Sequence, residues 1–354
     1  MEIPVTVEAR RGPSGRRLRG FWSTEALGDV EGLMQRLAAG GRLDRLGLIL
    51  QEHLATGGKR LRARLALGAV ECMGAERSVG VGWAAACELL HNATLIHDDL
   101  QDRDRMRRGH PAAWARHGAA QAINAGDLAL MLPTLAIDQV PVEAGVKWYL
   151  SRCLASHAER VARGQAFELE LLPRRRVKWS AYAQAASAKT AALFSLPVEG
   201  AALCAGRSQE RAHALAEAFA PIGLLFQIQD DVLDLYGDKG RSEVGCDLRE
   251  GKVSALVSEH LRLHPAEAPS LLALLSMPRD ETPAEGVEHY IREFVDGGAL
   301  AAVWQRMHAI EEAIDASVVL EQEPRLHALA LELVCLAVAP IAHTVPNLAG
   351  RMHG

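Results

Sequence analysis

The sequence predicts an all-α protein built as a single domain. Strand-like alternation is almost absent, alanine and leucine dominate, and apolar residues recur at i, i+3, i+4 and i+7 over long windows. No serine- or glycine-rich linker divides the 354 residues, and no fixed-period repeat appears. We therefore expect one helical domain over 21–354, with a smaller C-terminal helical part after about residue 265.

The apolar periodicity predicts a series of helices, which in chain order span 24–39, 42–55, 59–74, 79–102, 111–138, 143–169, 178–192, 194–205, 208–236, 252–263, 267–276, 284–295, 298–317 and 324–344. Glycine, proline and charged residues favour turns between them, as in TGGK, RRGHP, LPRRR, CAGRS, YGDKG, LHPAEAP and MPRDETP. Residues 1–20 carry charge without an apolar core of signal-peptide length, which predicts a flexible basic tail.

The composition excludes several classes of protein. Hydrophobic residues make up 49% and charged residues 23%, as in ordinary globular proteins, and the net charge of −5 argues against a general nucleic-acid binder. The six cysteines form no CxxC pair, which indicates reduced thiols in a cytoplasmic protein rather than a disulfide framework or a zinc site. No stretch approaches the roughly 20 uncharged apolar residues of a membrane span.

Two acidic clusters stand out because each follows an apolar helical run. DDLQD begins at Asp98 and DDVLD begins at Asp230. Helix geometry puts Asp98 and Asp102 on one face, and Asp230 and Asp234 likewise share a face, although like charges at this spacing repel. One cluster is readily explained as a solvated helix end, but two copies favour bound cations. Magnesium fits, because it takes one or two carboxylates and binds phosphate oxygens with its other positions.

Basic residues accompany the acidic clusters. They are Lys59, Arg60 and Arg62 in TGGKRLR, Arg107 and Arg108 in the turn after the first cluster, Lys189 in AKT, and Lys252 in EGKVS. A Gly-Gly turn into a helix N-terminus suits a phosphate, because free N–H groups and the helix dipole meet there. Each cation alone is explained as a surface charge. Together with the acidic clusters, they predict a pocket for more than one diphosphate.

In combination, GGKRLR, HDDLQDRDRMRRG, GQAFELE, KT and FQIQDDVLD make the chain resemble the trans-prenyltransferases, the isoprenyl diphosphate synthases. The resemblance covers roughly residues 45–260 and is nearest to geranylgeranyl-type synthases. It implies a bundle of antiparallel helices around a deep central cavity, usually in a homodimer. It also implies head-to-tail condensation of isopentenyl diphosphate with an allylic diphosphate.

The resemblance implies a role for each motif. Magnesium ions, three in each active site, would be held by Asp98, Asp102 and Asp230, with Asp99, Asp231 and Asp234 as further ligands or helpers. The allylic diphosphate would be held by Arg107, Lys189, Gln227 and Lys252. Isopentenyl diphosphate would be held by Lys59, Arg62, His91 and Arg108. The alternative for His91 on its own is a buried histidine with its hydrogen bonds satisfied.

The chemistry of this family explains why acidic and basic groups gather at an apolar bundle. Metal ions and cationic side chains stabilise the departing diphosphate, and the isopentenyl alkene attacks the allylic cation before a proton is lost. Water must be kept from the cation. Thr190 and Gln227 would stabilise it, and Gln165 would face the reaction centre, with Glu168 where the family usually has aspartate.

Small residues before the first cluster favour a twenty-carbon product. In this family the positions one turn earlier form the tunnel floor, and here they are Ala93 and Thr94, where farnesyl-type synthases carry bulky aromatics. One turn of helix, about 5.4 Å, is near the length of an isoprene unit. We therefore expect the floor one turn deeper, at Leu90 and Cys87 with Met131, Leu132 or Leu135 from the neighbouring helix. A longer product is the second expectation and farnesyl diphosphate the third.

The chain departs from the family pattern after the second cluster. The stretch from 237 to 247 is shortened, and Glu243 stands where a lysine is expected, so that Lys239 or Arg241 is left as a substitute. Ala63 replaces a usual proline. Class I terpene cyclases are disfavoured because their second metal motif is rich in Asn, Ser and Glu. A non-catalytic partner subunit remains an alternative, although such subunits lose acidic residues or the arginine pair and this chain retains both.

Overall fold

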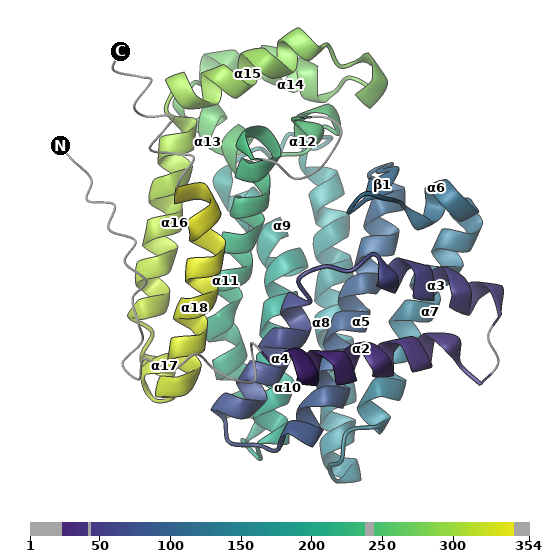
Figure 1. The fold of residues 1–354 in the computed structure, drawn as a ribbon. Helices are drawn as coiled ribbons and strands as arrows, with labels where there is room; N and C mark the ends of the chain where they lie inside the picture. Colours follow the sequence, from purple (N-terminus) through teal and green to yellow (C-terminus); the bar gives the residue numbers. More distant parts are fainter. Residues whose placement is uncertain (1–22, 42–43, 238–243, 343–354) are drawn as a thin grey trace.

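The computed structural model describes residues 23–41, 44–237 and 244–342, and it confirms the all-α fold (Figure 1). The first half contains α2 (Thr24–Ala39), α3 (Arg45–Ala55), α4 (Leu61–Cys72), α5 (Arg77–Gln101), α6 (Ala113–His117), α7 (Ala119–Asp138) and α8 (Ala144–Leu171). A hairpin of β1 (Met106–Arg107) and β2 (His110–Pro111) separates α5 from α6, with Met106 opposite Pro111.

The second half continues with α9 (Trp179–Ala186), the π-helical turn η1 (Ser187–Ala191), α10 (Ala192–Cys204), α11 (Gln209–Tyr236), α12 (Cys246–Arg249) and α13 (Ala255–Leu263). The elements after these are the 3-10 turns η2 (Pro265–Glu267) and η3 (Arg279–Glu281) with α14 (Ala268–Leu275), α15 (Ala284–Asp296), α16 (Ala299–Asp315), α17 (Val318–Glu321) and α18 (Pro324–Ala342).

The long helices pack side by side as a bundle (Figure 1). α5 packs against α4 and α7, while α10 packs against α4, α8 and α11. α16 and α18 cover α11 from the other side, and α14 and α15 lie above α12 and α13 in this view. Trp83 fixes α5 against α10: its ring is fully buried, its indole N–H donates to the Pro197 carbonyl at 2.9 Å, and a side chain at Gly200 would overlap it. The core is therefore packed closely enough to hold the helix ends in register.

Several helices begin at polar side chains that accept a first-turn N–H. Ser23 accepts from Ala26 at the start of α2, and Ser208 accepts from Arg211 at the start of α11. Asp44 and Ser254 cap α3 and α13 in the same way. Each cap lies next to the start of an apolar periodic stretch. The helix starts predicted from the sequence therefore fall within a few residues of the observed ones.

The differences between predicted and observed elements have local causes. The predicted helix 111–138 is broken into α6 and α7 at Gly118, whose φ of 88° ends the first piece. The predicted helices 178–192 and 194–205 form one continuous rod through η1. The hairpin, α12 and α17 were not predicted, because each is too short to show a periodicity. The tail over 1–20 lies outside the described residues, and the division after 265 stays a prediction.

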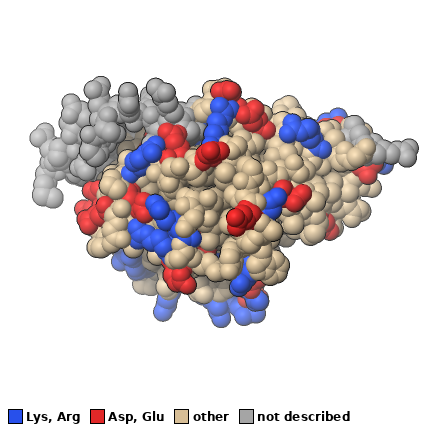
Figure 2. All heavy atoms as spheres, turned by 90° about the horizontal axis from the view of Figure 1, so that it is seen from below, with Lys and Arg blue, Asp and Glu red and all other residues tan. Residues whose placement is uncertain are grey.

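Two helices come nearer to a membrane span than expected from the sequence, although each carries charged residues and neither establishes a span. α7 and α18 are long and apolar enough by length and composition, and 44% of each apolar window is buried inside the structure. Both helices pack in the bundle, α7 on α5 and α18 on α11, as core helices do. On the face seen in Figure 2, acidic and basic side chains are interspersed among a larger area of other residues.

Candidate active site

The first acidic cluster ends α5 and lies among cationic side chains from other helices. Asp98 is 3.6 Å from the Lys189 ammonium of η1, and Asp102 accepts a hydrogen bond from Lys252 at 2.7 Å. Burial raises the pKa of Asp98, Lys189 lowers it, and the neighbouring carboxylates of Asp102 and Glu168 raise it further. The structure therefore crowds negative charge at a place where water cannot fully stabilise it.

The hairpin after α5 returns Arg107 onto this cluster. The guanidinium donates from Nε to both carboxylate oxygens of Asp99, at 2.7 and 2.8 Å, and from a second nitrogen as well. Asp99 is only 1% exposed. Burial lowers the pKa of Arg107, but the Asp99 and Asp98 carboxylates outweigh burial and raise it above its usual value. This paired geometry fixes Arg107 beside the motif.

The second cluster ends α11 and supports the chain that follows it. Asp231 accepts the backbone N–H of Ala255 at 2.8 Å, and Asp234 accepts that of Asp247 at 3.0 Å. Both carboxylates are 4% exposed, whereas Asp230 is exposed. Burial, reinforced by Asp247, raises the pKa of Asp231 to about 8. Asp231 and Asp234 thus act as caps for the segment that begins α12 and α13.

The π-helical turn η1 joins the two clusters. Thr190 donates its hydroxyl hydrogen to Gln227 Oε1 at 2.8 Å, and Gln227 Nε2 donates to Asp231 at 3.1 Å. Lys189 of the same turn donates to Glu168 at 2.7 Å besides facing Asp98. A π turn widens a helix locally and is often found at functional positions.

Two glycines allow neighbouring helices to approach η1. A side chain at Gly164 of α8 would overlap the backbone of Lys189, and one at Gly223 of α11 would overlap that of Ala191. Glycine is therefore required on both sides of the turn because the backbones touch there.

A second cationic group lies at the start of α4. Arg62 stacks over the Phe194 ring, with 4.8 Å from its guanidinium carbon to the ring centre, and burial lowers its pKa to about 10. Burial also lowers the pKa of His91 well below its usual value, and Arg62 and Arg108 add to this effect. Arg108 donates to the Gly57 carbonyl, and a side chain at Gly58 would overlap its guanidinium. The Gly-Gly turn thus brings Lys59, Arg62, His91 and Arg108 into one region.

Buried hydrogen-bonding atoms in this region lack partners within the described part of the chain. Arg62 Nε, His91 Nδ1 and Gln165 Oε1 are buried and make no hydrogen bond there. Such atoms are costly to leave unsatisfied, so they favour a polar ligand beside them. The N–H groups of Arg62 and His91 can bind an anion, and the two carboxylate clusters can bind the metal ions that accompany it. The donor set therefore fits magnesium diphosphate chemistry.

Comparison with known proteins identifies the family. Residues 44–294 match the family model described as polyprenyl synthetase. The chain belongs to this family. A short chain isoprenyl diphosphate synthase of Methanothermobacter thermautotrophicus is 32% identical over 288 residues, which are 79% of this chain and 86% of that protein. A geranylgeranyl diphosphate synthase of Sulfolobus acidocaldarius is 37% identical over 220 residues, 60% of this chain and 66% of that protein.

Solved structures share the fold. The crystal structure of a polyprenyl synthase from Caulobacter crescentus, complexed with calcium and isoprenyl diphosphate, has a TM-score of 0.78 and 27% identity, and it covers 89% of this chain and 94% of that chain. The predicted resemblance to isoprenyl diphosphate synthases and the assignment as a prenyltransferase are therefore confirmed.

Several residues of this polyprenyl synthetase were not found from the sequence. Arg279 of η3 donates to Asp104 at 3.1 Å and to Glu250 at 2.7 Å, and so ties the C-terminal part to the end of α5. Glu250 and Asp247 were also missed, and they contact the predicted Lys252 at 2.8 and 3.6 Å. Arg279 stands in MPRDETP, which predicted only a turn, because no local pattern indicates a contact 175 residues away.

The start of α4 depends on a buried pair that the motif did not reveal. Arg60 has φ of 49° and no side-chain cap, and Glu88 of α5 accepts the Ala63 N–H at 3.1 Å in place of a cap. Arg60 also donates to Glu31 at 3.1 Å. Glu88 and Arg60 therefore fix the position of the Gly-Gly turn, and the role of Arg60 is structural.

The residues proposed to set product length lie inside the bundle. Ala93 is fully buried, Leu90 and Cys87 are each 1% exposed, and the Thr94 hydroxyl donates to the His91 carbonyl at 2.7 Å. Of the three alternatives predicted on α7, only Leu132 is buried, whereas Met131 and Leu135 are 64% and 53% exposed. Met131 and Leu135 point away from the core of this chain.

A cavity lies near the hairpin and apart from the two acidic clusters. The cavity, of about 230 Å³, lies between α3, α6 and the hairpin, and its lining includes His53, Arg107, Arg116 and His117 but neither acidic cluster. Burial lowers the pKa of His53 to about 3, and the Arg107 charge lowers it further.

Lys239, Arg241 and Glu243 of the loop after α11 lie outside the described residues. The predicted replacement of the family lysine by Lys239 or Arg241 therefore stays a prediction.

Proposed function

We propose that the protein condenses isopentenyl diphosphate head to tail with allylic diphosphates and that geranylgeranyl diphosphate is its main product. One observation carries the proposal: Lys189 and Lys252 contact the first acidic cluster and Gln227 contacts the second, and Thr190, next to Lys189, is hydrogen-bonded to Gln227. A site of this kind can accept metal ions and two anionic substrates together. The names of the two relatives given above, both isoprenoid diphosphate synthases, support this class of substrates.

Asp98, Asp102 and Asp230 are proposed to hold magnesium, with three ions in each active site. Magnesium, when bound, neutralises the negative charge that develops on the departing diphosphate. The raised pKa of Asp98, caused first by burial, supports this role, because a cation relieves the cost of its buried charge. Asp99, Asp231 and Asp234 are proposed to position neighbouring groups, since each already holds Arg107 or a backbone N–H.

Arg107, Lys189, Gln227 and Lys252 are proposed to hold the allylic diphosphate. Lys189 and Lys252 are paired with Asp98, Glu168 and Asp102 without substrate. A metal-bound diphosphate would separate these pairs, since the carboxylates would turn to the metal ions and the ammonium groups to the phosphate oxygens. The exchange keeps every buried charge compensated, which a buried site requires.

Lys59, Arg62, His91 and Arg108 are proposed to hold isopentenyl diphosphate. The atoms without partners at Arg62 and His91 support this assignment, because an anion would satisfy both. Because its pKa is lowered by burial, His91 would act as a neutral hydrogen-bond donor. Apolar side chains lie next to these cations. The ring under the Arg62 guanidinium is Phe194, which is fully buried and stacks on Phe226 with 4.8 Å between ring centres. Such a wall would keep water from the allylic cation, while Thr190 and Gln227 would stabilise it.

Product length is proposed to depend on Ala93, Thr94 and Leu90. The small side chains at 93 and 94 let a growing chain pass, and Leu90 stands about one turn deeper. A longer polyprenyl diphosphate remains the alternative product and farnesyl diphosphate the next. A non-catalytic partner subunit is the alternative in another class, and it is disfavoured by the presence of all six carboxylates of the two clusters.

A homodimer is proposed through α7 and α8. Exposed apolar side chains gather on these two helices, with Met131 at 64%, Leu135 at 53%, Trp148 at 63% and Tyr149 at 38% exposure. Large exposed apolar residues on adjoining helices indicate an interface. A cytoplasmic location is also proposed, and it is supported by the six cysteines, none of which forms a disulfide.

Product analysis tests the function. The purified protein is incubated with magnesium, isopentenyl diphosphate and, in separate reactions, allylic diphosphates of five, ten and fifteen carbons, and the dephosphorylated products are measured by mass spectrometry. A dominant twenty-carbon alcohol is expected, and Ala93→Phe is expected to shorten it to fifteen carbons. Longer products would place the floor deeper than Leu90. No elongation from any primer would refute the synthase assignment and favour the partner subunit.

A further inference from the structure

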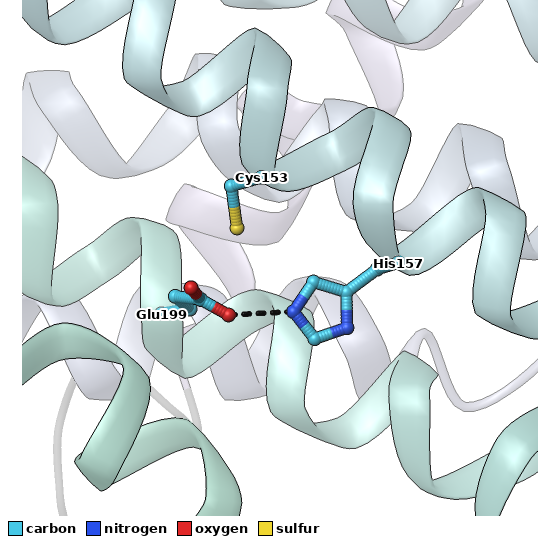
Figure 3. Close-up of side chains that lie close together, drawn as sticks. All are labelled: Cys153, His157 and Glu199. Atoms are coloured by element: carbon cyan, nitrogen blue, oxygen red, sulfur yellow. Dashed lines mark hydrogen bonds and ion pairs between the residues drawn. The ribbon is translucent and has the colours of Figure 1, made fainter. Parts of the chain in front are cut away.

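A separate group of ligand-type side chains lies between α8 and α10 (Figure 3). Cys153 and His157 are four residues apart on α8 and therefore project from one face. Glu199 of α10 faces them, with 2.6 Å between His157 Nε2 and the Glu199 carboxylate, and the Cys153 sulfur points into the same space. One ligand atom from each residue lies within 4.8 Å of the other two.

This group takes no part in the proposed condensation. His157 stands eight residues before Gln165 on the same helix, which corresponds to about 12 Å along the axis. Neither Cys153 nor His157 contacts an acidic cluster among the interactions of the described residues. Its residue types also differ from the all-oxygen set of the clusters, which indicates a different ligand.

We propose that Cys153, His157 and Glu199 bind a divalent transition-metal ion and that zinc fits the site best. A thiolate, an imidazole and a carboxylate are the ligands that tetrahedral zinc takes in proteins. Ligand atoms around zinc lie about 3.3–3.8 Å apart, given bonds of about 2.0–2.3 Å. The present separations need only small side-chain rotations to reach this geometry, because the three side chains already face one another.

Charge compensation favours a divalent ion in this place. Cys153 is 7% and His157 3% exposed, and the Glu199 side chain is 17% exposed. A thiolate and a carboxylate together carry two negative charges, so a divalent ion makes the buried site neutral. Without metal, burial raises the pKa of the Cys153 thiol, and Glu199 raises it further, so binding must displace the thiol proton.

His213 of α11 would supply a fourth ligand after a side-chain rotation, because it is outside the group whose ligand atoms already lie within 4.8 Å of one another. His213 Nδ1 lies 3.8 Å from the second carboxylate oxygen of Glu199, and the His213 side chain is 62% exposed. Its exposure gives the ion a route from solvent, and rotation of the imidazole can close the coordination shell. Four protein ligands from three helices describe a structural rather than a catalytic metal site. The ion would tie α8, α10 and α11 together.

Cobalt provides the direct probe, because thiolate-bound tetrahedral cobalt absorbs through sulfur-to-metal charge transfer and oxygen-bound cobalt does not. The full-length protein is stripped with a chelator and titrated with Co²⁺, and zinc content is measured separately after dialysis. One equivalent with the charge-transfer band is expected, and zinc is expected to displace it. Zinc is also expected to raise the Tm of the protein.

Variants separate this site from other thiols and from the acidic clusters. Cys153→Ser is expected to abolish the band, His157→Gln and Glu199→Gln to weaken cobalt binding by more than about tenfold, and His213→Ala to weaken it less. Cys335→Ser, which removes an exposed thiol of α18, is the matched control and is expected to bind as the unchanged protein does. Circular dichroism verifies that each variant is folded.

The proposal is overturned if the unchanged protein shows no charge-transfer band, or if Cys153→Ser keeps it. Zinc that binds equally to the unchanged protein and to folded His157→Gln and Glu199→Gln would belong to the acidic clusters or to the surface. In either case the three side chains form only a buried hydrogen-bonded group. The condensation activity is measured in parallel, so failure of this proposal leaves the proposed function separately testable.

Discussion

The two acidic clusters have the same spacing but different surroundings. At the end of α5, Asp98 and Asp102 face the ammonium groups of Lys189 and Lys252, which come from distant parts of the chain. At the end of α11, Asp231 and Asp234 accept backbone N–H groups of the segment that follows. Only Asp230 of the second cluster is exposed. Two motifs of the same spacing therefore have different roles. The first cluster faces lysine side chains from other helices, and the second also holds the backbone of the segment that follows it.

The largest expected effect is at the first cluster. Asp98→Asn removes a proposed magnesium ligand, and we expect kcat to fall by about 10²–10³-fold or more. The Tm is not expected to fall, because burial raises the pKa of Asp98, so its ionised form destabilises the fold at neutral pH. Steady-state kinetics and thermal unfolding measure both. Asp127→Asn on α7 is the matched control, and undiminished activity of Asp98→Asn would contradict the metal assignment.

The connection between the clusters is tested next. Gly164→Ala inserts a methyl group against the Lys189 backbone, and we expect η1 to shift and kcat to fall up to about 100-fold. Gly145→Ala on the same helix has no neighbouring atom within 4 Å and serves as the control. Kinetics with each allylic primer detect the loss. Equal activity of the two variants would mean that the position of η1 does not matter for catalysis.

The supporting role of the second cluster predicts a loss of stability. Asp234→Ala leaves the buried Asp247 N–H without its acceptor, which costs about 1–3 kcal/mol of unfolding free energy. Asp234→Asn retains an acceptor and is expected to recover most of that stability, whereas Asp230→Ala changes it by less than about 0.5 kcal/mol. Urea unfolding measures these differences. If Asp234→Asn loses as much activity as Asp98→Asn, Asp234 is a metal ligand and the contrast between clusters is wrong.

The smallest expected effect concerns pH. Burial raises the pKa of Glu250 from 4.5 to about 7, partly opposed by Lys252. Because the folded state then binds more protons than the unfolded state between these values, stability without magnesium falls as pH rises from about 4.5 to about 7. Glu250→Gln is expected to reduce this dependence of the unfolding free energy on pH, by an amount that corresponds to up to about one bound proton. Unfolding at several pH values measures it, with Glu285→Gln as the exposed control; an unchanged slope would show that Glu250 is not buried as described.

The sequence by itself determined the all-α fold, most helix bounds, and the residue types and spacing of the two clusters. These features are local: helical periodicity, caps such as Ser208 and the four-residue spacing of Asp98 and Asp102 are all visible along the chain. The family followed from the same motifs, because their residue types reflect the charge of the substrates.

Only the tertiary structure decided which partner each charge meets. Arg279 reaches Asp104 across 175 residues, and Lys252 reaches Asp102 across 150. Glu88 caps α4 from α5, and the unequal burial of Asp230 and Asp234 separates two residues that the motif presents alike. These outcomes depend on which helices pack together, since burial and distance set the pKa and the partner of a charge, and neither is written in its immediate neighbours.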